Sequence, residues 1–241
     1  MALFTCRDLS FAYEGNTVVA GLNFSVQRGD YLCVVGENGS GKSTLIKGLL
    51  GLKQPQGGEI TRGENLKSHE IGYLPQQTAA QKDFPASAYE VVLSGRLGMR
   101  GLRPFYSGAD KAAAAEIMER LDISLLAGCC YRDLSGGQQQ RVLLARALCA
   151  AAVGSGSGHG LRALLLDEPV TGLDPIVTYD LYQQLSRVNE EAGLGIVMIS
   201  HDVRSAVLYA SHILHLDGGQ AFFGSAADYA ASETGARFLG R

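Results

Sequence analysis

Residues 31–44 read YLCVVGENGSGKST, and the fold can be inferred by working outward from this stretch. Its opening run of apolar residues predicts a buried β-strand at 31–35. The glycine-rich loop that follows matches the pattern G-x-x-x-x-G-K-[ST], and a helical pattern comes directly after it at 42–50. A strand, such a loop and a helix in this order predict a site that binds phosphate groups.

The loop pattern has a physical reason. Glycines allow consecutive backbone N–H groups to surround a polyphosphate, and the helix that follows adds positive potential at its N-terminus. We expect Lys42 to contact the β- and γ-phosphates of a nucleotide and the Ser43 hydroxyl to bind Mg²⁺. A glycine-rich turn with an unrelated lysine is the alternative, which the strand–loop–helix context disfavours. The predicted nucleotide-binding residues are Gly36, Glu37, Asn38, Gly39, Ser40, Gly41, Lys42, Ser43 and Thr44.

Other patterns place this loop in a larger sheet. Residues 163–166 and 195–199 each form a short apolar run before a polar turn, which predicts further strands of a buried parallel sheet. Residues 23–26 alternate polar and apolar side chains, as in a half-exposed antiparallel strand. Strands that alternate with helices predict the α/β fold class, here with an additional N-terminal antiparallel β-layer.

The chain also shows a change of pattern along its length. Strand signals are scarce between residues 77 and 150, where helix signals are common. We therefore predict a single domain over 1–241. Its parallel-sheet core and β-layer occupy about 1–76 and 151–241, and an inserted α-helical lobe occupies about 77–150.

Capping residues predict where several helices begin and end. Gly51 suits the end of the first helix, and Asp110 suits the N-cap of a helix at 111–121. Asp174 followed by Pro175 suits the start of a helix that Gly193 can close.

Composition excludes several classes of protein. The net charge of −3 argues against a general nucleic-acid-binding protein, which usually carries a basic face, so we expect no nucleic-acid partner. No apolar run approaches the ~18–20 residues that a membrane span needs. The five cysteines lack the spacing of metal ligands and are expected to be reduced thiols.

A pair of carboxylates follows the predicted strand at 163–166. Asp167 and Glu168 come at its carboxyl end, which is the edge where open α/β sheets bind ligands. Asp167 is suited to hold Mg²⁺ through a water molecule, and Glu168 is suited to accept a proton from an attacking water. Two acidic residues that only end a strand in solvent would be the alternative.

Residues 134–138 read LSGGQ, and with them the chain resembles the ATP-binding subunit of ATP-binding-cassette (ABC) transporters. The resemblance runs nearly end to end and implies the ABC ATPase fold. The motifs that carry it, in the order of that family, are the phosphate loop at 36–44, Gln76, the LSGGQ motif, Asp167 with Glu168, Asp174 and His201.

The resemblance implies a role for each matching residue. Glu168, His201 and Gln76 are expected to be catalytic, and Mg²⁺ is expected to be held by Ser43, Gln76 and Asp167. Gln77 follows Gln76 directly, so the register of that glutamine stays open. The further residues expected to bind ATP are Tyr13, which would stack on the adenine, and Ser135, Gly136, Gly137, Gln138 and Asp174.

One chain offers two elements suited to bind phosphate but a single lysine-bearing loop, and this implies an assembly of two copies. In the family, two copies join head to tail, and the Lys42 loop of one copy and the Ser135 motif of the other close on the same ATP. The expected partners are therefore a second copy of the chain, an integral membrane permease and, indirectly, an extracytoplasmic substrate-binding protein. The expected location is peripheral, on the cytoplasmic face of the membrane.

Residues 81–96 read QKDFPASAYEVVLSGR and resemble the importers of metal ions, zinc and manganese. ATPases of siderophore or cobalamin importers, an ABC exporter and a soluble iron–sulfur assembly ATPase remain as alternatives. His212 and His215 lie three residues apart in a predicted strand, on opposite faces, which argues against a joint metal site. Residues 154–160 (GSGSGHG) are expected to form a surface loop.

Overall fold

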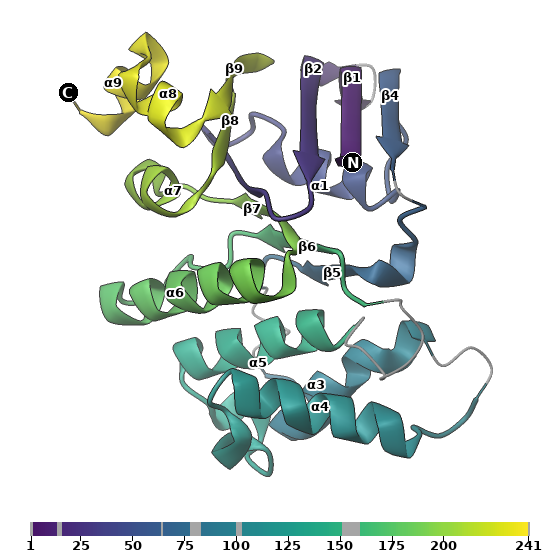
Figure 1. Cartoon of the computed structure of the whole chain (residues 1–241). Helices are drawn as coiled ribbons and strands as arrows, with labels where there is room; N and C mark the ends of the chain where they lie inside the picture. The colour runs from purple at the N-terminus through teal and green to yellow at the C-terminus, as the bar shows by residue number, and fades with distance from the viewer. Residues whose placement is uncertain are drawn as a thin grey trace. The chain divides into compact units, whose positions relative to one another are not determined.

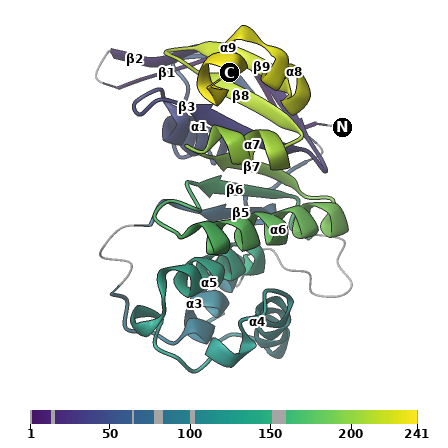
Figure 2. The same cartoon turned by 90° about the vertical axis from the view of Figure 1, so that its left-hand side faces the viewer.

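The computed structural model describes residues 2–13, 16–63, 65–77, 83–99, 103–150 and 160–240, and for Tyr13 it describes the backbone alone. Contacts divide the chain into two compact units (Figures 1 and 2). The first comprises Met1–Leu66, Leu165–Glu168 and Val188–Arg241, and the second comprises Lys67–Leu164 and Pro169–Arg187.

Strands and helices alternate along much of the chain, as the α/β prediction requires. The strands are β1 (Ala2–Tyr13), β2 (Asn16–Gln27), β3 (Tyr31–Gly36), β4 (Gly57–Arg62), β5 (Ile71–Leu74), β6 (Ala163–Asp167), β7 (Gly195–Ile199), β8 (His212–Leu216) and β9 (Gln220–Ser225). The α-helices are α1 (Lys42–Leu49), α3 (Ala88–Ser94), α4 (Gly108–Arg120), α5 (Gly136–Cys149), α6 (Pro175–Ala192), α7 (Val203–Tyr209), α8 (Ala226–Ala231) and α9 (Glu233–Leu239). Short 3₁₀ turns are η1 (Ser68–Glu70), η2 (Gly95–Met99), η3 (Ser124–Leu126) and η4 (Tyr131–Asp133).

The first unit contains an antiparallel sheet of strand order β2-β1-β4 (Figure 1). Phe4 of β1 lies between Val26 of β2 and Arg62 of β4. Phe24 and Val26 are buried while Ser25 between them is partly exposed, because successive side chains of a strand point to opposite faces. The predicted N-terminal antiparallel layer is confirmed.

The same unit contains the strands that carry the phosphate loop. In the order β7-β3-β8-β9, β3 pairs in parallel with β7 and β8, and β9 pairs antiparallel to β8. Strands β3 and β7 are buried over nearly their whole length, as strands with two covered faces must be. The predicted parallel core is confirmed. The first residues after β3 form the glycine-rich loop, so the sheet fixes where that loop starts.

In the second unit, α5 packs against α3, α4 and β5 (Figure 2). Helices α3, α4 and α5 each begin at a serine that forms a reciprocal capping box with the residue three positions on. The prediction that Asp110 is an N-cap is therefore wrong. Ser107 caps α4, and Asp110 returns the bond by accepting from the Ser107 backbone N–H at 2.9 Å. The capping box shifts the start of α4 three residues toward the N-terminus.

A buried ion pair ties α4 to η2 within the second unit. The Arg96 guanidinium donates from Nε to Asp110 Oδ1 at 3.0 Å and from Nη1 to the Cys149 carbonyl at 3.4 Å. Burial acts to raise the pKa of Asp110, but hydrogen bonds from Ser107 and the charge of Arg96 outweigh it and lower the pKa to about 2.

The ends of two other helices lie where the sequence predicts them. Gly51 and Gly193 follow α1 and α6 with φ angles of 75° and 59°, the left-handed conformation that ends many helices. Within the described parts of the chain, none of the helices combines the length and the apolarity that crossing a membrane requires. Residues 154–159 of the predicted glycine-rich loop lie outside the described residues.

Candidate functional site

The phosphate loop depends on glycines where the backbone is most unusual. Gly41, the N-cap of α1, has a φ of 94°, which an L-residue with a side chain rarely adopts. Gly36 has a φ of 144°, and a Cβ atom there would collide with the Leu216 carbonyl of β8. The two glycines let the loop turn directly from the end of β3 into α1.

The Lys42 side chain is hydrogen-bonded to the backbone of this loop. Its ammonium donates to the carbonyls of Gly36 at 2.9 Å and Glu37 at 2.7 Å, and only 6% of the residue is exposed. Burial lowers the pKa of Lys42, while the charges of Glu168 and Asp167 act to raise it. A positive charge held in this loop favours the binding of an anionic group.

The Ser40 hydroxyl gives an independent indication of a ligand. Among the described residues, Ser40 Oγ is one of few buried side-chain polar atoms that form no hydrogen bond. A buried polar group without a partner costs free energy, so such an atom in a native protein calls for an explanation. A phosphate oxygen bound in the loop would supply the missing partner, and the loop therefore fits ATP.

Asp167 lies beside the first turn of α1. The Ser43 hydroxyl donates to Asp167 Oδ1 at 3.1 Å. Burial raises the pKa of Asp167 and so does the charge of Glu168, while the Ser43 hydrogen bond and nearby lysines oppose the shift. A hydroxyl and a carboxylate in contact are hard oxygen donors of the kind that Mg²⁺ prefers, so this pair fits the predicted metal.

Glu168 and His201 are in contact within the first unit. His201 Nε2 lies 2.5 Å from Glu168 Oε1, and the two side chains are 40% and 11% exposed. Glu168 has a φ of 53°, a left-handed backbone conformation that is rare for a residue with a long side chain and is common at functional sites. Glu168 also lines a pocket of about 190 Å³ together with Val18, Asn38, Gly39, Gly41, Lys42, Ser43 and Thr44.

The LSGGQ motif, in the second unit, lies at a helix N-terminus that is suited to bind an anion. Ser135 caps α5, its hydroxyl accepting from the Gln138 N–H, and Gln138 Oε1 accepts from the Ser135 N–H at 3.0 Å. The N-terminus of a helix this long attracts anions through its backbone dipoles. Gly137 allows close packing against α6, because a Cβ there would lie 2.6 Å from Val177 Cγ1.

Asp174 lies at the start of α6, and its Oδ1 accepts from the N–H groups of Ile176 and Val177, both at 3.0 Å. The predicted helix start is confirmed. Because Val177 packs on Gly137, the Asp174 turn and the LSGGQ motif are brought together within the second unit.

The two glutamines after β5 differ in their surroundings. Gln77 donates from Nε2 to the Tyr131 hydroxyl at 2.8 Å and to Gln139 Oε1 at 3.2 Å. Gln76 has an exposed side chain. The register of the glutamine therefore stays a prediction, with Gln76 the more exposed of the two. Tyr13 ends β1, and its side chain lies outside the described part of the chain.

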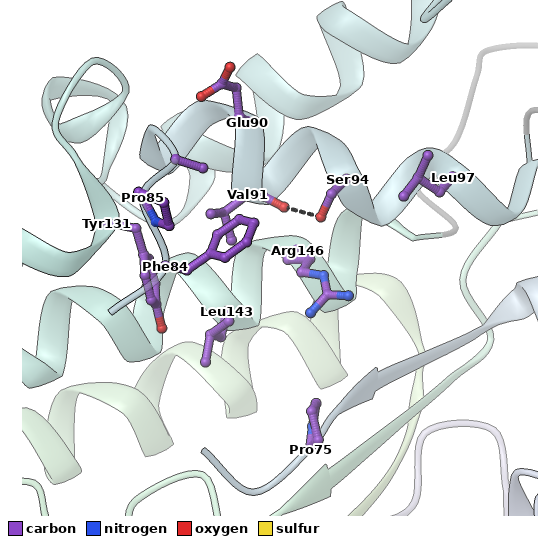
Figure 3. Close-up of a pocket in the computed structure, with 11 residues that line it drawn as sticks. Pro75, Phe84, Pro85, Glu90, Val91, Ser94, Leu97, Tyr131, Leu143 and Arg146 are labelled. Carbon is purple, nitrogen blue, oxygen red and sulfur yellow. Dashed lines mark hydrogen bonds between the residues drawn. The ribbon is translucent and has the colours of Figure 1, made fainter. Parts of the chain in front are cut away.

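A groove of about 670 Å³ opens on the second unit (Figure 3). Phe84 points into it between Val91 of α3 and Leu143 of α5. Glu90 and Arg146 add one charge of each sign, so the lining is apolar with two charged residues. The other lining residues are Pro75, Pro85, Ala86, Ser94, Leu97 and Tyr131.

Sequence reasoning missed several features of this site. The unpartnered Ser40 hydroxyl, the groove and the contacts of Gln77 all result from tertiary packing and carry no local sequence signal. His212 and His215 have different neighbours, Ser211 Oγ at 3.0 Å and Tyr229 OH at 2.8 Å. The described residues contain no group of three or more His, Cys, Asp or Glu side chains that could hold a metal ion.

Comparisons with known proteins find similar sequences and structures. The family model described as ABC transporter matches residues 19–171. The zinc uptake system ATP-binding protein ZurA of Listeria innocua is 32% identical over 229 residues, covering 92% of this chain and 86% of that protein. The hemin import ATP-binding protein HmuV of Chelativorans sp. is 38% identical over 231 residues, covering 92% of this chain and 85% of that protein. The solved structure of CbiO1 from Clostridium perfringens, part of the ABC transporter complex CbiONQ, superimposes with a TM-score of 0.81 at 25% identity, covering 99% of this chain and 94% of that one.

Proposed function

The chain belongs to the ABC transporter family, and from this membership we propose that it is the ATP-hydrolysing subunit of an importer that takes up a divalent metal ion, zinc or manganese. As a member of the family it binds ATP and couples ATP hydrolysis to transport. The observation that carries the assignment of residues is the pocket that Glu168 shares with Lys42 and Ser43 of the phosphate loop.

In this proposal, Glu168 is the general base. A water molecule attacks the γ-phosphorus, its proton passes to the Glu168 carboxylate, and the bond between the γ-phosphorus and the oxygen that bridges to the β-phosphate breaks. His201, within hydrogen-bond distance of Glu168, orients that carboxylate and the water. Lys42 holds the β- and γ-phosphates, and the backbone N–H groups of residues 36–44 surround them.

Ser43, Asp167 and Gln76 would hold Mg²⁺ in this site. When bound, the ion neutralises charge on the phosphate oxygens. Asp167 is suited to this role because a cation restores the ionised form that its burial disfavours. Tyr13 would stack on the adenine.

A complete site is proposed to need two copies of the chain. The Ser135 motif binds the γ-phosphate of the ATP held by the Lys42 loop of the opposite copy, and Asp174 lies at the same interface. The capped N-terminus of α5 and its packing on the Asp174 turn support this assignment. Gly136, Gly137 and Gln138 complete the element.

The groove on the second unit is proposed to receive the membrane permease. Its exposed Phe84 and Leu97 are apolar side chains that a partner would cover. The protein would thus lie at the cytoplasmic face of the membrane as a peripheral subunit. An extracytoplasmic substrate-binding protein would act on the same permease from the other side.

The proposed cargo rests on relatives and on residues 81–96. Zinc and metal transport systems recur among the similar curated proteins, and a hemin importer is also similar. ATPases of siderophore or cobalamin importers, an exporter and an iron–sulfur assembly ATPase remain the competing assignments, without an observation that favours them.

Metal uptake by cells tests the cargo. A strain that lacks this gene is expected to lose high-affinity uptake of zinc or manganese and to recover growth when either metal is supplied in excess. The wild-type gene should restore uptake, and a matched gene that encodes Glu168→Gln should not. Unchanged accumulation of both ions in the deletion strain would reject the metal assignment and leave the ATPase assignment in place.

A further inference from the structure

The five cysteines of the chain, all within its described parts, fall into two groups. Cys6, Cys33 and Cys149 are buried, whereas Cys129 is exposed and Cys130 is partly exposed. Burial raises the pKa of Cys6 to about 12 and that of Cys149 to about 11, and it raises the pKa of Cys33 as well. Because the thiolate is the reactive form of cysteine, the three buried thiols are poor nucleophiles. The accessible thiols are therefore the two that are neighbours in the chain.

The backbone around this pair is held against the start of α3. The Ala88 N–H donates to the Cys129 carbonyl at 2.9 Å, and Ser87 and Cys130 form an antiparallel bridge. The Cys129 N–H in turn donates to the Leu126 carbonyl at 2.9 Å. The peptide unit that joins the two cysteines is thus part of a fixed arrangement, and rotating it would break the hydrogen bond from Ala88.

The bridge lies at the edge of the groove. Ala86 comes directly before it and Tyr131 directly after it, and the Tyr131 N–H donates to the Ala86 carbonyl at 2.8 Å. Both residues line the groove together with Phe84 (Figure 3). A change in the backbone between Cys129 and Cys130 would therefore act on the lining of the groove.

We propose that Cys129 and Cys130 form a peroxide-sensitive site at the edge of the groove. Oxidation to a disulfide between the two neighbours disturbs the contact of residues 129–131 with the start of α3. The consequence for docking of the permease, which the altered groove would hinder, rests on the proposed function, whereas the oxidation itself does not.

The reaction uses a peroxide as its oxidant, here written for hydrogen peroxide. The thiolate of Cys129, the more exposed of the two, attacks a peroxide oxygen, the O–O bond breaks, and Cys129 becomes a sulfenic acid while a hydroxide leaves. The Cys130 thiolate then attacks the Cys129 sulfur, so that the S–S bond forms, the S–O bond breaks and a second hydroxide leaves. The two thiol protons convert both hydroxides to water. The thiols lose two electrons in all, and the peroxide gains them.

A disulfide between neighbours would be easily reversed. Consecutive Cα atoms lie about 3.8 Å apart, closer than the separation of about 4.4–6.8 Å that most disulfides span. Closing the ring therefore strains the backbone, and strained or exposed disulfides are readily reduced by other thiols. The pair is suited to a transient response rather than to permanent stabilisation of the fold.

Mass spectrometry of the purified full-length protein gives the first test. After brief treatment with hydrogen peroxide, the peptide that contains Cys129 and Cys130 should weigh less by two hydrogen atoms and should resist alkylation until a dithiol reductant is added. Cys130→Ser should stop at the sulfenic acid of Cys129, which a reagent selective for sulfenic acids detects. Cys6→Ala, a change at a buried thiol, is the matched control and should keep the wild-type response.

Amide hydrogen exchange of the same samples gives the second test. Oxidation should raise the exchange rates of the Ala88 and Tyr131 N–H groups by at least about threefold, because their hydrogen bonds to the Cys129 and Ala86 carbonyls are disturbed. Peroxide-treated Cys130→Ser should keep the rates of the untreated protein, because it cannot close the ring. Circular dichroism checks that each variant is folded before treatment.

The two measurements together decide the proposal. Ring closure within one chain together with faster exchange supports it. It is overturned if the wild-type peptide only gains oxygen, if non-reducing electrophoresis shows a disulfide between two chains instead, or if the exchange rates do not change once the ring has closed. Neither measurement involves ATP, so failure of the proposed function, seen as absence of ATP hydrolysis by the wild-type protein, would be a separate result.

Discussion

Glu168 shows how much chemistry can depend on one backbone conformation. Its left-handed φ of 53° follows directly on Asp167, whose side chain accepts from Ser43. The two consecutive carboxylates therefore have different partners. Asp167 accepts a hydrogen bond from Ser43, and Glu168 contacts His201. A conformation of this kind costs of the order of 1–3 kcal/mol, and its presence at this position agrees with a catalytic role for Glu168.

Replacement of Glu168 by Gln tests that role at the scale of the single residue. The amide keeps the shape of the side chain and cannot take the proton, so we expect ATP hydrolysis to fall by about 10²–10³-fold while ATP binding persists. Phosphate release from the purified protein and nucleotide binding measure the two effects. A variant that binds ATP and hydrolyses it at the wild-type rate would remove Glu168 from the mechanism.

Serine caps fix the starts of α5, which follows the LSGGQ serine, and of α3, which lines the groove, and one buried ion pair lies close to the ends of both helices. Arg96 and Asp110 are each largely enclosed, and Asp110 takes part in the capping box of α4 as well. Leu97, which follows Arg96 directly in η2, lines the groove. Arg96 and Asp110 are not themselves among the described residues that line the groove, so we expect the pair to affect stability rather than the lining.

Arg96→Met should lower the free energy of unfolding by about 3 kcal/mol, because it leaves the Asp110 carboxylate buried without its cation. Denaturant unfolding monitored by circular dichroism measures this loss. The matched double variant Arg96→Met with Asp110→Leu should recover part of it, since both charges are then absent. A single variant as stable as the wild type would show that the ion pair contributes little.

The same pair predicts a dependence on pH. The pKa of Asp110 is lowered from 3.8 to about 2 in the folded protein, so the folded state binds this proton less readily than the unfolded state does. The stabilisation is therefore present above about pH 4 and is lost as pH falls toward 2. The difference in unfolding free energy between wild type and Asp110→Asn should be constant from pH 7 to pH 5 and shrink below pH 4. A constant difference down to pH 2 would contradict the assignment.

Elements with local signals were predictable from the sequence, and contacts between distant residues were not. The phosphate loop is recognisable because its glycines and lysine are adjacent in the chain, and β3 before it is a simple apolar run. The start of α4 was misplaced because Asp110 takes part in a capping box that begins three residues earlier. The bonds of Gln77 span 54 and 62 residues, a separation at which sequence patterns carry no information about side-chain partners.

At the scale of the whole molecule, the two elements that are proposed to bind phosphate are of different kinds and lie one in each compact unit. The loop around Lys42 is equipped to hold a nucleotide on its own. The capped end of α5 offers backbone dipoles and a serine but no cation in its first turn of the kind that Lys42 supplies. Because the Ser135 element lacks such a cation, we expect it to contribute to hydrolysis by contacting a nucleotide that the Lys42 loop of another copy already binds.

Ser135→Arg tests this arrangement. A bulky cation at the closing surface should reduce ATP hydrolysis by at least about tenfold, while ATP binding to the separate chain should stay near the wild-type level because the Lys42 loop is intact. Mixing it with Lys42→Ala gives dimers in which one site carries both changes and the other carries neither, so hydrolysis should partly return. Undiminished hydrolysis by Ser135→Arg alone would exclude the shared site.

The hydrogen bonds of Lys42 to Gly36 and Glu37 also bear on how the catalytic cycle ends. The ammonium has three donors, and two carbonyl oxygens of the loop compete with phosphate oxygens for them. The charged γ-phosphate oxygens of ATP are stronger acceptors for the ammonium than the neutral carbonyls are. ADP lacks these oxygens, so the carbonyls compete with it more evenly for the ammonium. The loop thus contains its own acceptors for the Lys42 ammonium, and we expect this competition to weaken the binding of ADP relative to that of ATP.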